Sequence, residues 1–146
     1  MKNKYYTPEI EEFHVGFEYE FRTTVNWESK IFSENDFGSY FNPDGIEGKL
    51  KESRLRVKYL DKADIESLGF QFEIADNQAD LYFLYGDFKT PDGQYPVTKY
   101  ALTHHPETNH LIISAYNELL YEGTLFEGIC KNKSKLISLL KDIGKS

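Results

Sequence analysis

The sequence predicts an α+β fold: a single strand-rich domain over residues 1–146, built on a mostly antiparallel, twisted sheet of about six to eight strands. Three observations support this prediction. The chain has the length of about one domain, which can bury enough surface to fold without metal or disulfide staples. Aromatic residues make up 16% of it, and their rings favour strands. Apolar and polar residues alternate over several segments, whereas a strong helical stripe occurs once, near the C-terminal end.

The clearest strand pattern lies between residues 13 and 24. Its even-numbered positions are polar, charged or glycine, as in a strand that buries one face. Its odd-numbered positions are apolar as far as residue 21: Phe13, Val15, Phe17, Tyr19 and Phe21. Because a strand cannot bury such a face alone, we expect the C-terminal helix to cover it.

Residues 25–48 lose this alternation and are expected to form a long loop, which in a compact domain is often functional. Large apolar residues are scattered there among Ser, Asn, Asp and Gly: Trp27, Ile31, Phe32, Phe37, Tyr40 and Phe41. Two interpretations are equally open. The rings are exposed as a protein interface, or they fold over the open edge of the sheet as part of the core.

The middle of the chain predicts a short helix between strands. Asp61 is a suitable N-cap and Gly69 a suitable stop, which places the helix near residues 61–68. The flanking strands are expected at residues 50–60, 70–74 and 81–85.

The remainder of the chain predicts a meander followed by a helix. Its strands are expected at residues 97–105, 110–116 and 119–130. Asn132 then opens a helix near residues 132–143, whose apolar stripe must pack on a sheet face. The stripe consists of Leu136, Ile137, Leu139, Leu140 and Ile143.

Charge and cysteine content limit the classes of function. The chain has 17 Lys and Arg against 24 Asp and Glu, a net charge of −7. Nucleic acid and anionic lipid repel such a chain at long range, which disfavours a general polyanion-binding role. The single cysteine, Cys130, cannot form an intramolecular disulfide, and no segment resembles a secretory signal or a membrane span. These features predict a cytoplasmic protein.

Three segments, residues 5–20, 56–70 and 125–136, carry a resemblance. They begin Tyr5-Tyr6-Thr7-Pro8, Arg56-Val57-Lys58-Tyr59 and Leu125-Phe126-Glu127-Gly128. Together they resemble short uncharacterised proteins encoded by phages and prophages of gut-type bacteria. The resemblance implies a phage-related context, and it carries no activity or functional residue over to this chain.

Three histidines lie around the turn at residues 106–109: His104, His105 and His110. A hairpin with a four-residue loop places His105 opposite His110, so that the two imidazoles can share a metal with an Asp or Glu from another strand. His104 is expected on the opposite face of the sheet. The alternative, which we favour, is that these are exposed histidines at a hairpin tip without a metal.

Arg54, Arg56 and Lys58 alternate on one strand face, where they would suit a row of phosphates. The alternative is cross-strand pairing with Glu18 and Glu20. We favour pairing because the chain as a whole is acidic.

The acidic residues also allow more than one interpretation. Paired carboxylates support acid–base or two-metal chemistry only with convergent geometry, so a solvated face is the simpler expectation. A sharper hypothesis is that the acids imitate the phosphates of DNA and occupy a DNA-binding enzyme. The sequence contains no nucleophile elbow, phosphate-binding P-loop or dinucleotide fingerprint.

We therefore expect a small, acidic, non-enzymatic protein-binding protein without a cofactor. It would be an accessory or host-interaction (anti-defence) protein, and its partner a host or phage protein. The candidate binding residues are Trp27, Phe37, Tyr40, Phe41, Glu18 and Glu20. Two alternatives are a metal-dependent hydrolase that uses His105 and His110, and a nucleic-acid-associated protein that uses Arg54, Arg56 and Lys58.

Overall fold

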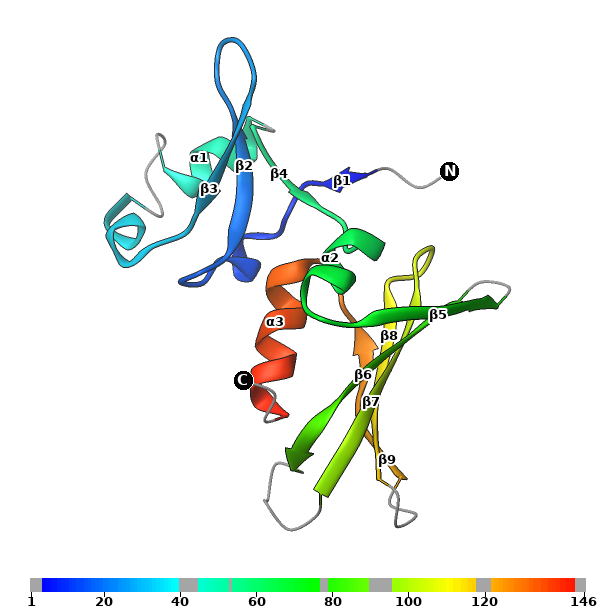
Figure 1. Ribbon diagram of the computed structural model, residues 1–146. Coiled ribbons are helices and arrows are strands. Elements are labelled where there is room, and N and C mark those ends of the chain that lie inside the picture. Colours follow the sequence, from blue (N-terminus) through cyan, green and yellow to red (C-terminus); the bar gives the residue numbers. More distant parts are fainter. Residues whose placement is uncertain are drawn as a thin grey trace. The chain divides into compact units, whose positions relative to one another are not determined.

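The computed structural model describes residues 4–39, 45–52, 54–76, 79–89, 96–117 and 122–143 (Figure 1). The predicted α+β class is confirmed, because the described residues form antiparallel sheets together with three α-helices. The strands form two sheets, of four and five strands, where we expected one sheet of six to eight. The chain divides into two compact units, Met1–Tyr59 and Leu60–Ser146, and each has its own hydrophobic cluster.

The first unit contains the four-stranded sheet, in the order β1-β4-β2-β3. Its strands are β1 (Tyr5–Tyr6), β2 (Glu18–Arg22), β3 (Trp27–Ile31) and β4 (Leu55–Lys58). Its helical segments are the 3-10 helices η1 (Ile10–Glu12) and η2 (Glu34–Ser39) and the helix α1 (Ile46–Lys51). Part of the expected loop is therefore the ordered strand β3.

Aromatic rings form the centre of the first unit. The ring of Phe13 lies 4.9 Å from that of Phe17, 5.2 Å from that of Tyr19 and 5.8 Å from that of Phe32, measured between centroids. These four residues are buried together with Ile46, Leu55 and Val57. Phe32, from the expected loop, is thus a core residue, and its exposed fraction is 0%.

The strand predicted between residues 13 and 24 is shorter than the alternation of its residues indicated. β2 begins at Glu18, because the chain turns at residues 14–17 through a hydrogen bond from the Phe17 N–H to the His14 carbonyl. Gly16 has a φ of +93°, a conformation that glycine adopts without strain. Val15 therefore points to solvent although it shares the parity of the buried rings.

The second unit contains the five-stranded sheet, a meander in the order β5-β6-β7-β8-β9. Its strands are β5 (Gln71–Asp76), β6 (Ala79–Lys89), β7 (Pro96–His105), β8 (His110–Tyr116) and β9 (Glu122–Ile129). Its helices are α2 (Lys62–Ser67) and α3 (Lys133–Asp142). No helix among the described residues has the length and apolar character required to cross a membrane.

Both predicted helices of this unit are confirmed, with the expected caps. The Asp61 carboxylate accepts a hydrogen bond of 2.9 Å from the Asp64 N–H at the start of α2, and Gly69 follows the helix with a φ of +98°. The Asn132 side-chain oxygen accepts a hydrogen bond of 2.8 Å from the Lys135 N–H at the start of α3. These contacts are local, so they can be predicted from nearby residues.

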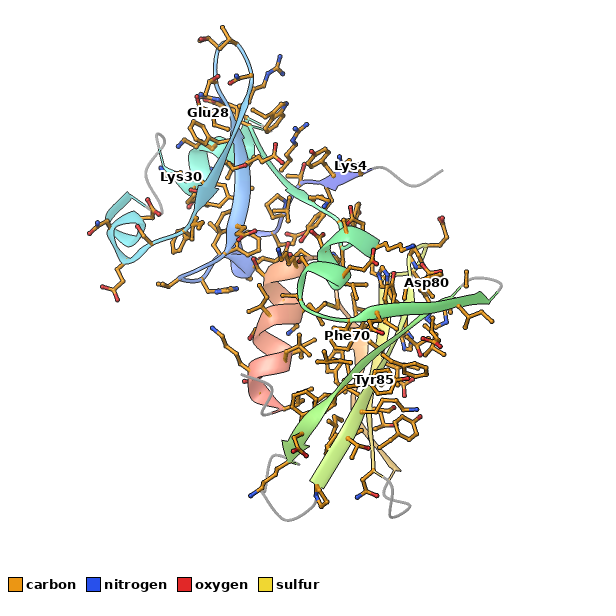
Figure 2. The ribbon with its side chains drawn as sticks, in the orientation of Figure 1. Lys4, Glu28, Lys30, Phe70, Asp80 and Tyr85 are labelled. Atoms are coloured by element: carbon orange, nitrogen blue, oxygen red, sulfur yellow. The ribbon has the colours of Figure 1, made fainter. Side chains whose placement is uncertain are left out.

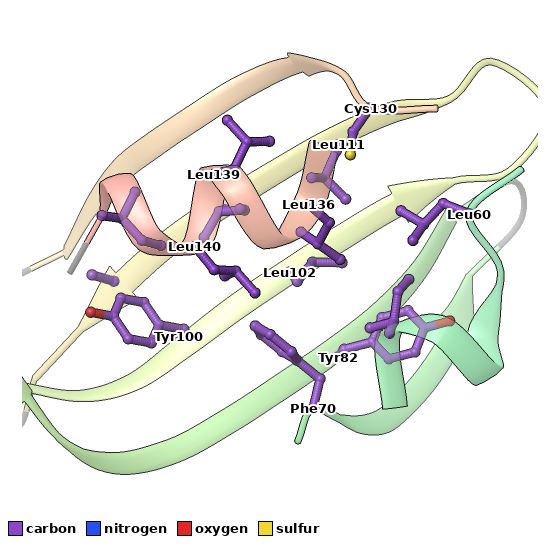
Figure 3. Packing of buried hydrophobic residues seen from close by; sticks show 14 of the residues in the cluster. Leu60, Phe70, Tyr82, Tyr100, Leu102, Leu111, Cys130, Leu136, Leu139 and Leu140 are labelled. Atoms are coloured by element: carbon purple, nitrogen blue, oxygen red, sulfur yellow. The ribbon is translucent and has the colours of Figure 1, made fainter. Parts of the chain in front are cut away.

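The apolar stripe of α3 packs on one face of the five-stranded sheet (Figures 1 and 3). The helix contributes Leu136, Leu139, Leu140 and Ile143, and the strands contribute Tyr82, Tyr100, Leu102, Leu111 and Ile113. Each Leu or Ile that is fully buried contributes about 1.5–3 kcal/mol. The expectation that α3 covers the aromatic residues near β2 is therefore wrong: those residues and the helix belong to different clusters, in different units.

Two tyrosine hydroxyls are buried within the second core. Tyr82 and Tyr100 have exposed fractions of 0%, and neither hydroxyl has a hydrogen-bond partner among the described residues. Burial, and to a smaller extent the carboxylates of Asp80, Glu66 and Asp61, raise the pKa of Tyr82 to about 12. A buried hydroxyl without a partner costs free energy, since its bonds to water are lost.

We expect Tyr82→Phe to leave the free energy of unfolding at pH 7 unchanged or to raise it by about 1 kcal/mol. A tyrosine ionises near pH 10 in the unfolded chain, whereas Tyr82 ionises near pH 12 in the folded chain. Its contribution to the free energy of unfolding is therefore complete below pH 10 and is lost as the pH rises to 12. The variant should consequently lose less stability over that range. Urea unfolding at pH 7, 10 and 11 measures this, with the exposed Tyr85→Phe as control. An unchanged pH dependence in Tyr82→Phe would contradict it.

Candidate functional site

The five-stranded sheet has a second face, turned away from α3. Strand pairing and alternation determine which side chains lie on it: Leu81, Thr103 and Ile112 form one row across the sheet, and Tyr85, Lys99 and Tyr116 form another. We call this side the outer face. Its described residues are Gln71, Ile74, Leu81, Phe83, Tyr85, Lys99, Ala101, Thr103, His105, His110, Ile112, Ser114, Tyr116, Thr124, Glu127 and Ile129.

The outer face is more apolar than a solvent-facing sheet usually is. Three of its residues are large, apolar and more than half exposed: Ile74 at 54%, Tyr85 at 56% and Ile129 at 53%. Tyr85 projects from β6 (Figure 2). The other side of an antiparallel sheet normally carries polar residues, so these apolar residues make the outer face a candidate interaction surface.

Lys99 lies at the aromatic end of the outer face. Its ammonium nitrogen is 4.4 Å from the centre of the Phe83 ring and 5.0 Å from that of Tyr116. The rings of Phe83 and Tyr85 are 6.0 Å apart. Such contacts are worth about 0.5–1 kcal/mol at exposed sites, and they hold the lysine against the sheet.

The histidines lie at the other end of the outer face. His105 is directly opposite His110, as predicted, and their ring centroids are 5.4 Å apart. The Nε2 atom of His110 is 3.4 Å from the Oε2 atom of Glu127 on β9. His104 is on the inner face and is 1% exposed. As the described side chains stand, no three His, Cys, Asp or Glu residues form a group that could hold a metal ion.

Carboxylates surround the outer face. Glu73 on β5, Asp87 on β6, Glu107 in the β7–β8 turn and Glu127 on β9 are all exposed. Their charges add to the net charge of −7 of the chain. Exposed apolar residues and carboxylates therefore lie side by side on the edge strands: Ile74 with Glu73 on β5, and Ile129 with Glu127 on β9.

In the first unit, Arg56 packs against two aromatic rings and pairs with a glutamate of a neighbouring strand. Its guanidinium carbon is 3.7 Å from the centre of the Tyr5 ring and 4.2 Å from that of Trp27. Its Nη2 and Nε atoms donate hydrogen bonds of 2.8 and 3.2 Å to Oε1 of Glu20. The predicted cross-strand pairing is confirmed for Arg56 and Glu20, whose side chains are 27% and 23% exposed.

The cations near β4 do not act as one row. Arg54 donates a hydrogen bond of 3.2 Å to the Arg22 carbonyl and another, of 3.3 Å, to Glu52. Lys58 lies opposite Tyr5 on β1. With Arg56 paired as well, both arginines are bound within the chain, which weakens the argument for a row of phosphates.

The structure places only some of the residues predicted to bind a protein. Trp27 is half-buried and packs on Arg56, and Glu18 is exposed at the start of β2. Phe37 belongs to η2, although its side chain lies outside the described residues. Tyr40 and Phe41 also lie outside the described residues.

Sequence reasoning missed the outer face, although β6 carried a signal for it. Residues 81–85 are apolar at both parities, with Leu81, Phe83 and Tyr85 on one side and Tyr82 and Leu84 on the other. A strand without alternation is typical of a sheet that is covered on both faces.

Cys130 has the properties of a core residue and not those of a nucleophile. It is fully buried, and burial raises the pKa of its thiol to about 12. Its Sγ atom lies 3.6 Å from the Asn132 carbonyl oxygen. Since the thiolate is the reactive form, Cys130 is inert at neutral pH.

Comparisons with known proteins gave no match for this chain. No family model matches the chain, and neither a curated protein nor a solved structure matches it. The phage-related context therefore stays a prediction.

We expect Arg56→Ala to lower the free energy of unfolding of the first unit by about 1–3 kcal/mol, because the Tyr5 and Trp27 rings lose their packing partner and Glu20 loses its ion pair. Arg56→Lys should recover only part of the loss, since an ammonium group does not stack. The single tryptophan, Trp27, reports the change by fluorescence during urea unfolding. The exposed Lys51→Ala is the control and should cost at most about 0.5 kcal/mol. Equal effects of Arg56→Ala and Lys51→Ala would show that the ring contacts contribute nothing.

Proposed function

We propose that this is a non-enzymatic binding protein, active in a phage-related context, whose outer face binds the apolar surface of a basic partner protein. The single observation that supports this most strongly is the exposure of Ile74, Tyr85 and Ile129 on a sheet face that α3 does not cover. These side chains gain about 25 cal/mol for each Å² of apolar surface that a partner removes from water.

The charge of the chain supports a partner of opposite sign. At −7, two copies repel each other at long range, whereas a protein with positive net charge is attracted and guided to the surface. The exposed carboxylates at the rim, such as Glu73 and Asp87, would meet its lysines or arginines. The exposed apolar side chains then supply most of the affinity, because exposed charges act mainly on the association rate.

We expect the triple variant Ile74→Thr, Tyr85→Thr, Ile129→Thr to weaken partner binding by about tenfold or more, since it removes the exposed anchors. Threonine preserves strand propensity, so the sheet should persist. Capture from host-cell lysate on the immobilised full chain, followed by mass spectrometry and titration of the recovered protein, measures the effect.

The matched control replaces three exposed apolar residues of the first unit, Val15, Val25 and Ile31, with threonine. It should keep the affinity of the wild type, and circular dichroism should show both variants folded. Undiminished capture by the first triple variant would overturn the proposal. The proposal would also be overturned if light scattering showed that the wild type is a dimer and that the first triple variant is a monomer. The outer face would then bind a second copy of the chain.

A further inference from the structure

We propose that His105, His110 and Glu127 form a binding site for a divalent transition metal ion at one end of the outer face. The three side chains come from β7, β8 and β9: strand pairing sets His105 opposite His110, and the Glu127 carboxylate reaches His110 diagonally from β9. This inference does not depend on the proposed function, because the metal is tested without a partner protein.

The two imidazoles are already at a suitable separation. Their ring centroids are 5.4 Å apart. Two imidazoles bound to one tetrahedral ion, with metal–nitrogen distances of about 2.0–2.1 Å, have centroids about 5 Å apart. The separation of the two rings therefore requires little change.

His105 also has an unused nitrogen. Its Nδ1 atom is buried and has no hydrogen-bond partner among the described residues. Buried polar atoms are usually satisfied, so an imidazole nitrogen that makes no hydrogen bond is a candidate ligand once the ring turns to admit an ion.

Glu127 supplies the third ligand. Its Oε2 atom lies 3.4 Å from Nε2 of His110, and its side chain is 59% exposed. The carboxylate now faces His110, and no three ligands converge among the described residues, so binding requires Glu127 to turn toward the space between the rings. An exposed side chain can make that turn at small cost, and water completes the coordination.

The ligand set selects the class of metal. Imidazole nitrogens suit Zn²⁺, Co²⁺, Ni²⁺ and Cu²⁺, whereas Ca²⁺ and Mg²⁺ prefer oxygen ligands. Neither His104, on the inner face, nor the buried Cys130 belongs to the set.

The test is calorimetric titration of the full, untagged chain with Zn²⁺ alone, with Co²⁺ absorption as a second readout. We expect one ion per chain, binding weakened at least tenfold by His105→Ala or His110→Ala, and a smaller loss for Glu127→Gln. The control is His14→Ala, the exposed histidine of the first unit, which should bind like the wild type. Mg²⁺ should not compete.

Circular dichroism separates a lost site from a lost fold. The proposal is overturned by absence of binding up to about 1 mM Zn²⁺. It is also overturned if folded His105→Ala and His110→Ala variants bind as tightly as the wild type, or if His14→Ala abolishes binding.

Discussion

The packing of α3 on the inner face of the five-stranded sheet determines the structure of the second unit. Leu136 and Leu140 require an apolar surface, and the register of β7 and β8 provides it by placing Leu102 opposite Ile113. A shift by one residue would exchange the two faces of a strand, so burial of this helix specifies the register strongly. The same register then fixes which side chains remain on the outer face. Its chemistry is a consequence of core packing, and it still exposes large apolar groups such as Tyr85.

The two ends of the outer face differ in the groups that they offer. At one end, Lys99 is held against Phe83 and Tyr116, and the surface is a ring platform with a fixed cation. At the other end, the hairpin sets His105 beside His110. Apolar contact with a protein would use Tyr85 at the first end together with Ile74 and Ile129, of which Ile129 lies opposite His110, whereas the imidazoles suit a small ligand. The two proposals therefore use different chemistry on one surface and can succeed or fail independently.

The parts of the fold that were predicted correctly depend on neighbours in the sequence. Caps mark α2 and α3, and a four-residue turn determines that His105 faces His110. The errors concern contacts between distant residues. Alternation near β2 could not show that a positive φ at Gly16 ends the strand pattern, or that these rings have core partners of their own within the first unit. Glu127 could not be predicted as the neighbour of His110, because a register shift in the β8–β9 pairing determines its position.

Aromatic rings also hold several lysine and arginine side chains in position. Arg56 lies against Tyr5 and Trp27, and Lys99 against Phe83 and Tyr116. Lys62 lies 4.2 Å from the Phe72 ring, and Lys49 lies 5.0 Å from the Phe21 ring. A cation held at a ring is fixed in position, and these cations are distributed over separate strands and helices. Within the described part of the second unit, for example, the ring-held Lys62 and Lys99 lie on different elements, α2 and β7, and not in a row along one strand. The net charge of −7 favours a basic protein as the partner.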